Sequence, residues 1–329
     1  MTATRRALIG ASLAAPIAAG GCAQAIGERP LRVADTHPSD YPTVAAVAEM
    51  GRLLAERTGG RLRFAMYSGG QLGEEIDTLE ITIFGGLDLN RVNLAPLNSI
   101  AAETIVPSLP FLFRSKAHMR TALDGAPGRA ILDSLKPHGL VGLAFYDSGE
   151  RSFYNTRGPI LKPADLNGLK LRVQSSDLFV ALVQAMGGDP TPMSYGEVYQ
   201  GLVTGVVDGA ENNWPSYEDS RHFEVAGFYS LTRHVMTPEI LVMSARTWGR
   251  LSREDQAVVQ DCARQSIPFM RSLWDQRETA AKARLIAAGV KVNEVDTAPF
   301  QALVAPVWDR FARNPRARAL VDQIQAMPG

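Results

Sequence analysis

Residues 168–188 read GLKLRVQSSDLFVALVQAMGG, a strand pattern that passes directly into a helix pattern. Leu171 and Val173 alternate with Arg172, which lies on the same face as the neighbouring Lys170 and Gln174, so one face of the strand is apolar and the other polar. Apolar residues at helical spacing then run through 177–186, and two glycines end the helix. Such a unit is typical of an α/β sheet covered by helices.

The same alternation of strand and helix patterns precedes this stretch. Strand patterns occupy 31–34, 61–67, 87–92 and 140–145, and helix patterns occupy 43–57 and begin again near Glu74. Ser194 and Glu197 match a capping box, which predicts a helix that begins at Tyr195. We therefore predict an α/β fold.

Two features suggest that the α/β units form two domains with a cleft between them. Asp88 is followed by Asn93 after one predicted strand, and Asp208 is followed by Asn212 after another, so each unit carries an amide near the end of a strand. Ligands of open α/β sheets bind beyond the carboxyl ends of strands. The length of 329 residues also fits two domains of ordinary size.

The segment 252–288 has no glycine and a single proline, Pro268. As one helix it would span about 50 Å at 1.5 Å per residue, enough to connect two domains. Two helices broken near Pro268 are an equally good interpretation.

The N-terminus has the features of a secretory signal peptide in the expected order. Arg5 and Arg6 precede an apolar run at 7–19, and the small-x-small pattern at 23–25 predicts cleavage after Ala25. Lipid attachment at Cys22 is an alternative, although the leucine usual three residues earlier is absent. Cleavage after Ala25 leaves Cys262 as the single cysteine, which excludes an intramolecular disulfide.

Composition excludes several classes of partner. Lys plus Arg and Asp plus Glu are equal at 34 each, so no basic face for nucleic acid is expected. After the N-terminus no apolar stretch reaches the length of a transmembrane helix.

The usual signatures of enzymes are missing. The sequence has no Gly-x-Ser-x-Gly, phosphate loop, Gly-x-Gly-x-x-Gly or Cys-x-x-Cys, and its five histidines lack metal-ligand spacing. We therefore expect no catalytic residue, metal or cofactor. An exported lyase or isomerase acting on sugar acids stays an alternative.

Arginines and amides near strand ends are the candidate binding residues. Arg172 lies within a predicted strand, Arg151 follows the strand at 140–145, and Asn212 belongs to a polar and aromatic cluster at 211–217. A guanidinium can hold a carboxylate through two parallel hydrogen bonds. Solvated surface charges are the alternative interpretation of both arginines.

Five stretches together carry a resemblance to a known family. They are QLGEE at 71–75, VPSLPFLF at 106–113, GLKLRV at 168–173, MSYGEVY at 193–199 and GVVDGAEN at 205–212. Over roughly residues 30 to 325 the chain resembles the solute-binding proteins of tripartite ATP-independent periplasmic (TRAP) transporters, the DctP-like family. The resemblance implies two α/β lobes joined by crossing strands and a long helix, which close on one ligand.

This resemblance sets the domain prediction. We expect a signal peptide at 1–25, a first lobe at 26–149 plus 238–277, and a second lobe at 150–237 plus 278–329. The expected location is the periplasm, and the expected partners are a small organic acid and the membrane subunits of a TRAP transporter. We expect a monomer.

The resemblance also assigns roles to individual residues. Arg172 occupies the position of the family arginine that pairs with the ligand carboxylate. Arg151 occupies the position of a second arginine of the family. The family's ligand-contacting positions fall on Glu75, Asn93, Tyr195 and Asn212, although some relatives carry an acidic residue where Asn93 stands.

Three segments, 37–43, 145–149 and 211–217, resemble the subgroup that binds hexuronates such as galacturonate and glucuronate. They add His37 and Asp147 as predicted contacts for sugar hydroxyls. Glu239 is a further predicted hydroxyl contact, because it lies near the presumed return crossing between the lobes. An aldonate, a dicarboxylate or a keto acid is the alternative ligand.

Overall fold

The computed structural model describes residues 29–328. The predicted signal peptide and the alternative lipid site at Cys22 lie outside the described residues.

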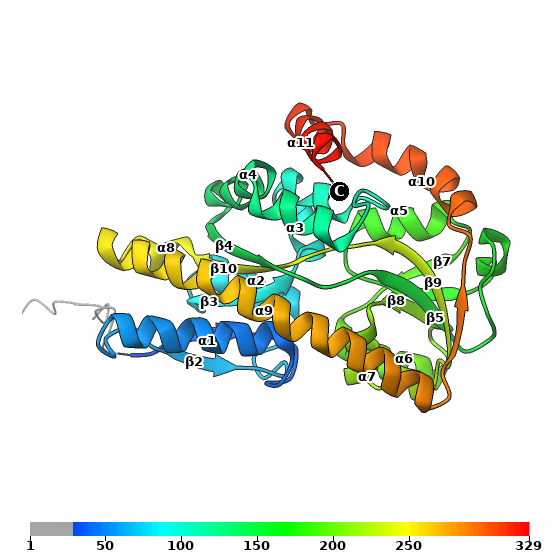
Figure 1. Cartoon of the computed structure of the whole chain (residues 1–329), viewed down its shortest axis with the longest axis horizontal. Coiled ribbons are helices and arrows are strands. Elements are labelled where there is room, and N and C mark those ends of the chain that lie inside the picture. Colours follow the sequence, from blue (N-terminus) through cyan, green and yellow to red (C-terminus); the bar gives the residue numbers. More distant parts are fainter. Residues whose placement is uncertain (1–28, 329) are drawn as a thin grey trace, which may run out of the picture.

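The described chain contains two mixed sheets, each flanked by helices (Figure 1). The first has the order β2-β1-β3-β10-β4 and is formed by β1 (Leu31–Ala34), β2 (Phe64–Tyr67), β3 (Leu89–Asn93), β4 (Leu140–Tyr146) and β10 (Glu239–Ser244). The second has the order β11-β9-β5-β8-β6-β7 and is formed by β5 (Arg151–Asn155), β6 (Lys170–Val173), β7 (Asp189–Pro192), β8 (Gly209–Asn212), β9 (Phe228–Val235) and β11 (Lys291–Glu294). The predicted α/β class is confirmed.

The chain passes between the sheets in three places. β4 leads into β5, and β9 leads back into β10, so two strand pairs run from one sheet to the other. The third connection is α9 (Arg253–Ala287), which packs on α1 (Pro42–Arg57) and on α7 (Trp214–Asp219) and runs along both halves of the molecule (Figure 1).

The remaining helices cover the sheets. They are α2 (Glu75–Ile83), α3 (Lys116–Asp124), α4 (Ala126–Ser134), α5 (Asp177–Ala185), α6 (Val198–Thr204), α8 (Ala245–Trp248), α10 (Ala298–Phe311) and α11 (Pro315–Ala326). Six short 3-10 helices, η1–η6, complete the fold at Ala95–Ser99, Ala102–Ser108, Lys136–His138, Pro163–Leu166, Tyr195–Glu197 and His222–Glu224.

The segment 252–288 forms one helix, and the alternative of two helices is wrong. Ser252 caps it by accepting a hydrogen bond from the backbone N–H of Asp255. Pro268 lies inside the helix and removes the N–H that would bond to Arg264. Both residues are exposed, so water can satisfy the freed carbonyl.

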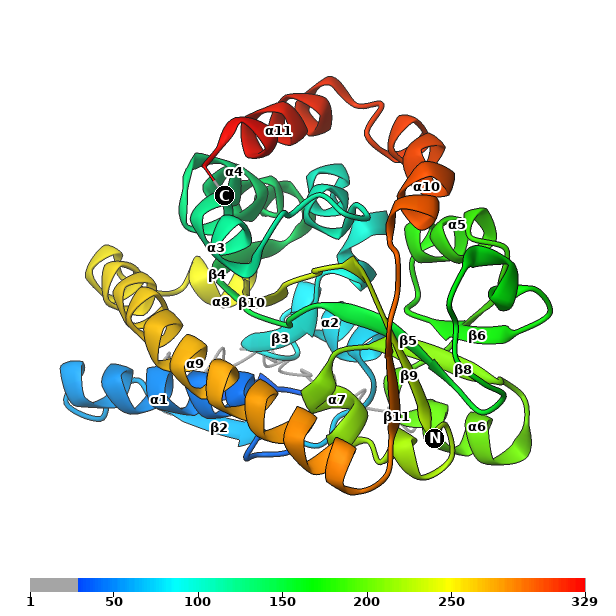
Figure 2. The same cartoon turned by 45° about the vertical axis from the view of Figure 1, so that its right-hand side comes forward.

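The C-terminal helices follow the second sheet but reach both halves. α10 packs against α5, and α11 lies over α4, as Figure 2 also shows. α11 packs against η2 as well. The predicted lobe boundaries fall close to the strand crossings, and they stay a prediction. Among residues 29–328, no helix is long and apolar enough to cross a membrane.

Local boundaries differ slightly from the predictions. The strand expected at 61–67 begins at Phe64, and that expected at 87–92 covers Leu89–Asn93. The capping box at Ser194 is present, but it begins a 3-10 turn that becomes helical only at Val198.

Candidate functional site

A cavity lies between the two sheets, where strands of both end. The space between its walls is about 320 Å³, which includes space open to solvent. Its walls are Thr36, His37, Glu75, Asn93, Arg151, Arg172, Gln174, Tyr195, Asn212, Ser216 and Glu239. An adjoining hollow of about 310 Å³ shares four of these residues and extends past Glu74 and Ser194.

The structure brings together every predicted binding residue except Asp147. Asn93 and Asn212 are the last residues of β3 and β8, Arg151 and Glu239 are the first residues of β5 and β10, and Glu75 begins α2. Their contact with a ligand stays a proposal.

The nomination of Asp147 needs correction. Its carboxylate accepts a hydrogen bond from Arg120 Nε at 2.7 Å and lies 3.6 Å from Arg271 Nε, so it faces α3 and α9. Successive residues of an extended segment point to opposite sides, and the next residue, Ser148, donates to Glu239 at 3.0 Å. Ser148 therefore takes the place in this polar network that was predicted for Asp147.

Three cavity residues were not predicted: Thr36, Gln174 and Ser216. Gln174 follows β6 on the face of Arg172, so strand alternation alone could have nominated it. Ser216 belongs to the polar and aromatic cluster at 211–217, from which the sequence predicted only Asn212 as a binding residue. No sequence pattern marks Thr36.

Arg172 is a buried cation without a carboxylate partner. It is 4% exposed, and its Nε donates to the carbonyl oxygen of Met193 at 2.8 Å. No carboxylate of residues 29–328 lies within ion-pair distance of its guanidinium. Burial lowers the pKa of Arg172 from its ordinary value, which reflects the free energy of holding this charge away from water.

Arg151, in contrast, is neutralised by a neighbour on β8. Its Nη2 donates to Glu211 Oε1 at 2.9 Å, and its Nη1 donates to Asn212 Oδ1 at 2.8 Å. Burial alone would raise the pKa of Glu211, but Arg151 and the nearby His234 bring that pKa down to about 2. Arg151 therefore brings hydrogen-bond donors to the cavity with little net charge.

Gln174 joins the two halves of the site. With its amide oxygen turned toward Arg151, this oxygen accepts from Nη2 at 3.0 Å and from Nη1 at 3.2 Å. The amide nitrogen then donates to Asn93 Oδ1 at 2.6 Å, across the cleft. This orientation satisfies both ends of the amide.

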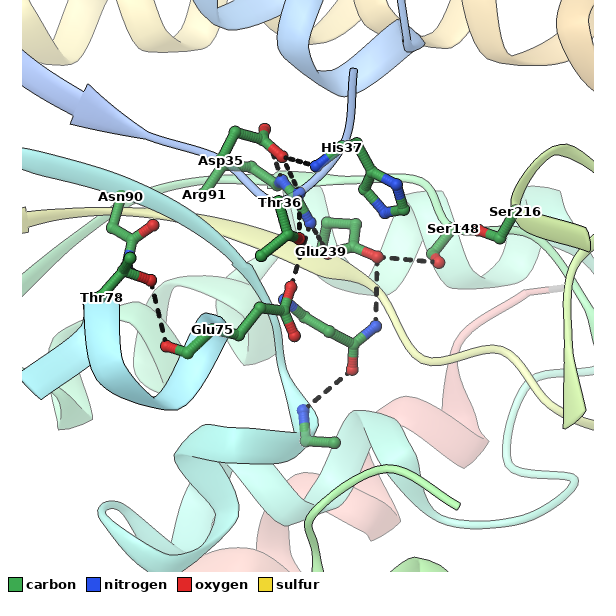
Figure 3. Close-up of polar contacts among 12 residues, drawn as sticks. Asp35, Thr36, His37, Glu75, Thr78, Asn90, Arg91, Ser148, Ser216 and Glu239 are labelled. Carbon is green, nitrogen blue, oxygen red and sulfur yellow. Dashed lines mark hydrogen bonds and ion pairs between the residues drawn. The ribbon is translucent and has the colours of Figure 1, made fainter. Parts of the chain in front are cut away.

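The wall formed by the first sheet is dominated by a buried ion cluster, which we call the Arg91 cluster: Arg91, Asp35, Glu75 and Glu239 (Figure 3). Arg91 Nε donates to Asp35 at 2.8 Å, and Nη1 donates to Glu239 at 2.7 Å and to Glu75 at 3.3 Å. Three carboxylates thus surround one guanidinium.

The surplus of negative charge affects Glu75. Burial raises its pKa to about 7, with Arg91 opposing this shift and Glu239 adding to it. The Glu75 carboxylate also accepts the backbone N–H of Asn93 at 2.9 Å. His37 stays neutral, because burial first and the charges of Arg91 and Arg151 next lower its pKa well below the ordinary value.

Aromatic rings close one side of the cavity. His37 stacks on Tyr41 with 3.9 Å between ring centroids, and Tyr195 meets His37 edge-on at 5.0 Å. Tyr41 and Tyr195 are held by Ser216, through its hydroxyl at 2.9 Å and its carbonyl oxygen at 3.0 Å. An aromatic surface of this kind suits the C–H face of a sugar.

The cleft therefore has two chemically different walls. The wall of the second sheet presents Arg172, whose guanidinium suits a carboxylate, beside the paired guanidinium of Arg151. The wall of the first sheet presents Glu75, Glu239 and Asn93, whose oxygens accept hydrogen bonds from hydroxyl groups. Within residues 29–328 no group of His, Cys, Asp and Glu is arranged to hold a metal ion.

A larger groove, between α4 and α9, lacks this chemistry. It encloses about 1180 Å³ including open solvent, and its arginines include Arg264 and Arg271. Arg271 donates to Asp124 at 2.7 Å, and Arg264 donates to Asp261 at 3.0 Å, so both charges are already paired. The third arginine of the groove, Arg129, is exposed to water, so a buried cation without a carboxylate partner distinguishes the cleft from this groove.

Known proteins are similar to this chain in sequence and in fold. Residues 33–314 match the DctP family, described as bacterial extracellular solute-binding protein, family 7. A TRAP periplasmic solute-binding protein from Bradyrhizobium, solved in complex with α/β-D-galacturonate, is 51% identical with a TM-score of 0.90, over 91% of this chain and 100% of that one. One from Roseobacter denitrificans with bound β-D-glucuronate is 44% identical with a TM-score of 0.89, over 91% and 100%. A solute-binding protein of Chromohalobacter salexigens is 42% identical over 88% of this chain and 87% of its own length.

Proposed function

The chain belongs to the DctP family of bacterial extracellular solute-binding proteins, and we propose that it captures a hexuronate, galacturonate or glucuronate, in its cleft. DctP-family proteins deliver solutes to TRAP transporters, and several structural neighbours bind galacturonate or glucuronate. The observation that carries the proposal is the buried, unpaired guanidinium of Arg172 opposite a wall of hydroxyl acceptors.

In the proposed complex the ligand lies with its two ends against different walls. Its carboxylate accepts from Arg172, whose guanidinium has no carboxylate partner among the described residues. Its hydroxyl groups donate to Glu75 and Glu239 and accept from Asn93, while a sugar face rests on Tyr195. Each of these residues lines the cavity.

The sugar acid explains the polar lining better than a smaller acid does. A buried polar group left without a partner costs about 1–3 kcal/mol, so a site built for hydroxyls rejects ligands that lack them. Succinate and pyruvate lack hydroxyl groups for the hydrogen-bond positions that Asn93, Glu75 and Glu239 still offer beside their protein partners.

We further propose that the protein binds without turnover, as a monomer in the periplasm, the compartment of its family. Both arginines are suited to holding an anion, and the cavity carboxylates are occupied by Arg91, Asn93 and Ser148. The rival proposal, a sugar-acid lyase or isomerase, requires product formation. Galacturonate incubated with the protein and followed by NMR should stay unchanged, and its conversion would refute binding alone.

A ligand screen tests the proposed ligand directly. Galacturonate and glucuronate should raise the melting temperature of the protein and give saturable heats in calorimetry. Galactose is the matched control, because it has CH2OH where galacturonate has its carboxylate, and it should bind at least ~100-fold more weakly. Equal melting-temperature shifts from succinate and galacturonate would overturn the proposal.

A further inference from the structure

We infer that the Arg91 cluster limits the ligand to a single carboxylate, so that the site admits hexuronates and aldonates and rejects aldarates, the diacids of the same length. This inference rests on the proposed orientation, in which the carboxylate meets Arg172 and the opposite end of the ligand meets Glu75 and Glu239.

Arg91 itself is not available to a ligand. Its side chain is 0% exposed. Asp35 accepts from Nε and from Nη2, Glu239 and Glu75 accept from Nη1, and Thr36 accepts from Nη2 at 3.4 Å. A guanidinium has five N–H groups, and these five contacts occupy all of them.

The carboxylates of the cluster outnumber its cation, and two of them line the cavity. The Glu75 side chain is 17% exposed and that of Glu239 is 4% exposed, whereas Asp35 is fully enclosed. Glu239 Oε1 already accepts from Asn93 at 3.1 Å and from Ser148 at 3.0 Å. When ionised, these oxygens can accept from one more hydroxyl but have no hydrogen to offer, and Glu75, with a pKa of about 7, is ionised above that pH.

Above pH 7, where Glu75 is ionised, a second ligand carboxylate at this wall would meet only acceptors of like charge. Like charges placed opposite each other in a dry site cost several kcal/mol, and a repulsive element of this kind is how a site discriminates between ligands of equal shape. Reversing the diacid changes nothing, because one of its two carboxylates always lies away from Arg172. The cluster thus acts on the charge of the far end of the ligand rather than on its size.

The charge of Glu75 is the part of the cluster that can be removed most cleanly. Glutamine at position 75 keeps an oxygen to accept the Asn93 N–H and to face Arg91, while Asp35 and Glu239 still balance the guanidinium. Asp77, two residues further along α2, is exposed and outside the cavity walls, so Asp77→Asn is the matched control for loss of one charge from the same helix.

Galactonate and galactarate form the matched ligand pair, because they differ only in a terminal CH2OH or carboxylate. By calorimetry the wild type should bind galactonate at least ~100-fold more tightly than galactarate, equivalent to about 2.7 kcal/mol. Glu75→Gln should reduce this ratio to within ~10-fold, and Asp77→Asn should leave it unchanged. Circular dichroism and a cooperative thermal unfolding transition show that each variant is folded, and Glu239→Gln replaces Glu75→Gln if the latter fails this check.

Three results would overturn the inference while leaving the proposed function intact. They are equal wild-type affinity for the two open-chain acids, no measurable galactonate binding by a wild type that binds galacturonate, and a ratio that Glu75→Gln changes no more than Asp77→Asn does. Failure of the wild type to bind galacturonate would instead refute the proposed function.

Discussion

Replacing Arg172 with methionine should weaken ligand binding and strengthen the ligand-free fold at the same time. In the free protein the substitution removes one hydrogen bond, from Nε to the Met193 carbonyl at 2.8 Å, a loss of about 1 kcal/mol. It also removes a charge that is 4% exposed and unpaired among the described carboxylates, and such a charge costs several kcal/mol. The balance favours the variant.

In the complex the same substitution leaves the ligand carboxylate buried without its cation. Truncating one partner of a buried charge pair costs about 2–5 kcal/mol, so the Kd for galacturonate should rise between ~30-fold and several thousand-fold. Arg172→Lys should fall between the two proteins, because an ammonium group cannot reproduce the two parallel hydrogen bonds of the guanidinium.

Calorimetry with galacturonate and thermal denaturation without ligand measure the two effects separately. Arg157→Met is the control, because Arg157 lies on the same lobe but is exposed and paired with Asp208 at 2.8 Å, away from the cavity. A Kd for Arg172→Met within threefold of the wild type would refute the role in binding. A ligand-free melting temperature several degrees below that of the wild type would refute the assigned cost of the unpaired charge.

Three further predictions concern the supports of the site. The pKa of Glu211 is about 2, below its ordinary value of 4.5, so its contribution to the free energy of unfolding is complete above pH 4.5 and is lost as the pH falls toward 2. Other carboxylates with lowered pKa values, such as Asp88 and Asp255, also lose their contributions, so urea unfolding at pH 5 and pH 3 should show a larger loss in the wild type than in Glu211→Gln. Gly149 has φ +62°, and a Cβ there would lie 2.7 Å from Glu278 Oε1. Gly149→Ala should therefore lower the free energy of unfolding by about 1–3 kcal/mol, measured by thermal unfolding. The loss should exceed that of the control Gly168→Ala, where φ is +70° and no atom lies near the added Cβ. Tyr41→Phe removes a 2.9 Å hydrogen bond to Ser216 across the cleft and should weaken galacturonate binding by ~2- to 10-fold. Tyr146→Phe, the control, removes a 2.6 Å hydrogen bond to Ser266 and should lower stability alone. Equal losses of affinity in the two variants would contradict this expectation.

The sequence predicts those site residues whose position depends on local pattern. Arg172 and Asn212 follow from strand periodicity and from the family motifs, because each lies at or near the carboxyl end of a short strand with a recognisable boundary. The long helix was recognisable for the same reason, although only the structure shows that Pro268 is tolerated on its exposed face.

Arg91 was not predicted, because its role depends on contacts remote in sequence. It is a fully buried arginine in β3, and its partners Asp35 and Glu239 are 56 and 148 residues away. Asp147 lies outside the cavity walls for a smaller reason: in an extended crossing, a shift of one residue exchanges the side chain that donates to Glu239 for the one that faces α3.

Only one of the two arginines has a carboxylate partner, and this difference determines which ligand charge the cleft can accept. Arg151 is balanced by Glu211, whereas Arg172 is not balanced, so the second wall carries about one net positive charge. If both arginines lacked carboxylates, the free protein would bear two desolvated cations, and a dianion would be the matching ligand. With one balanced and one free, a monoanion bound at Arg172 neutralises the wall. The negative surplus around Arg91 then opposes any further anionic group at the far end, so the two walls favour the same ligand charge for independent reasons.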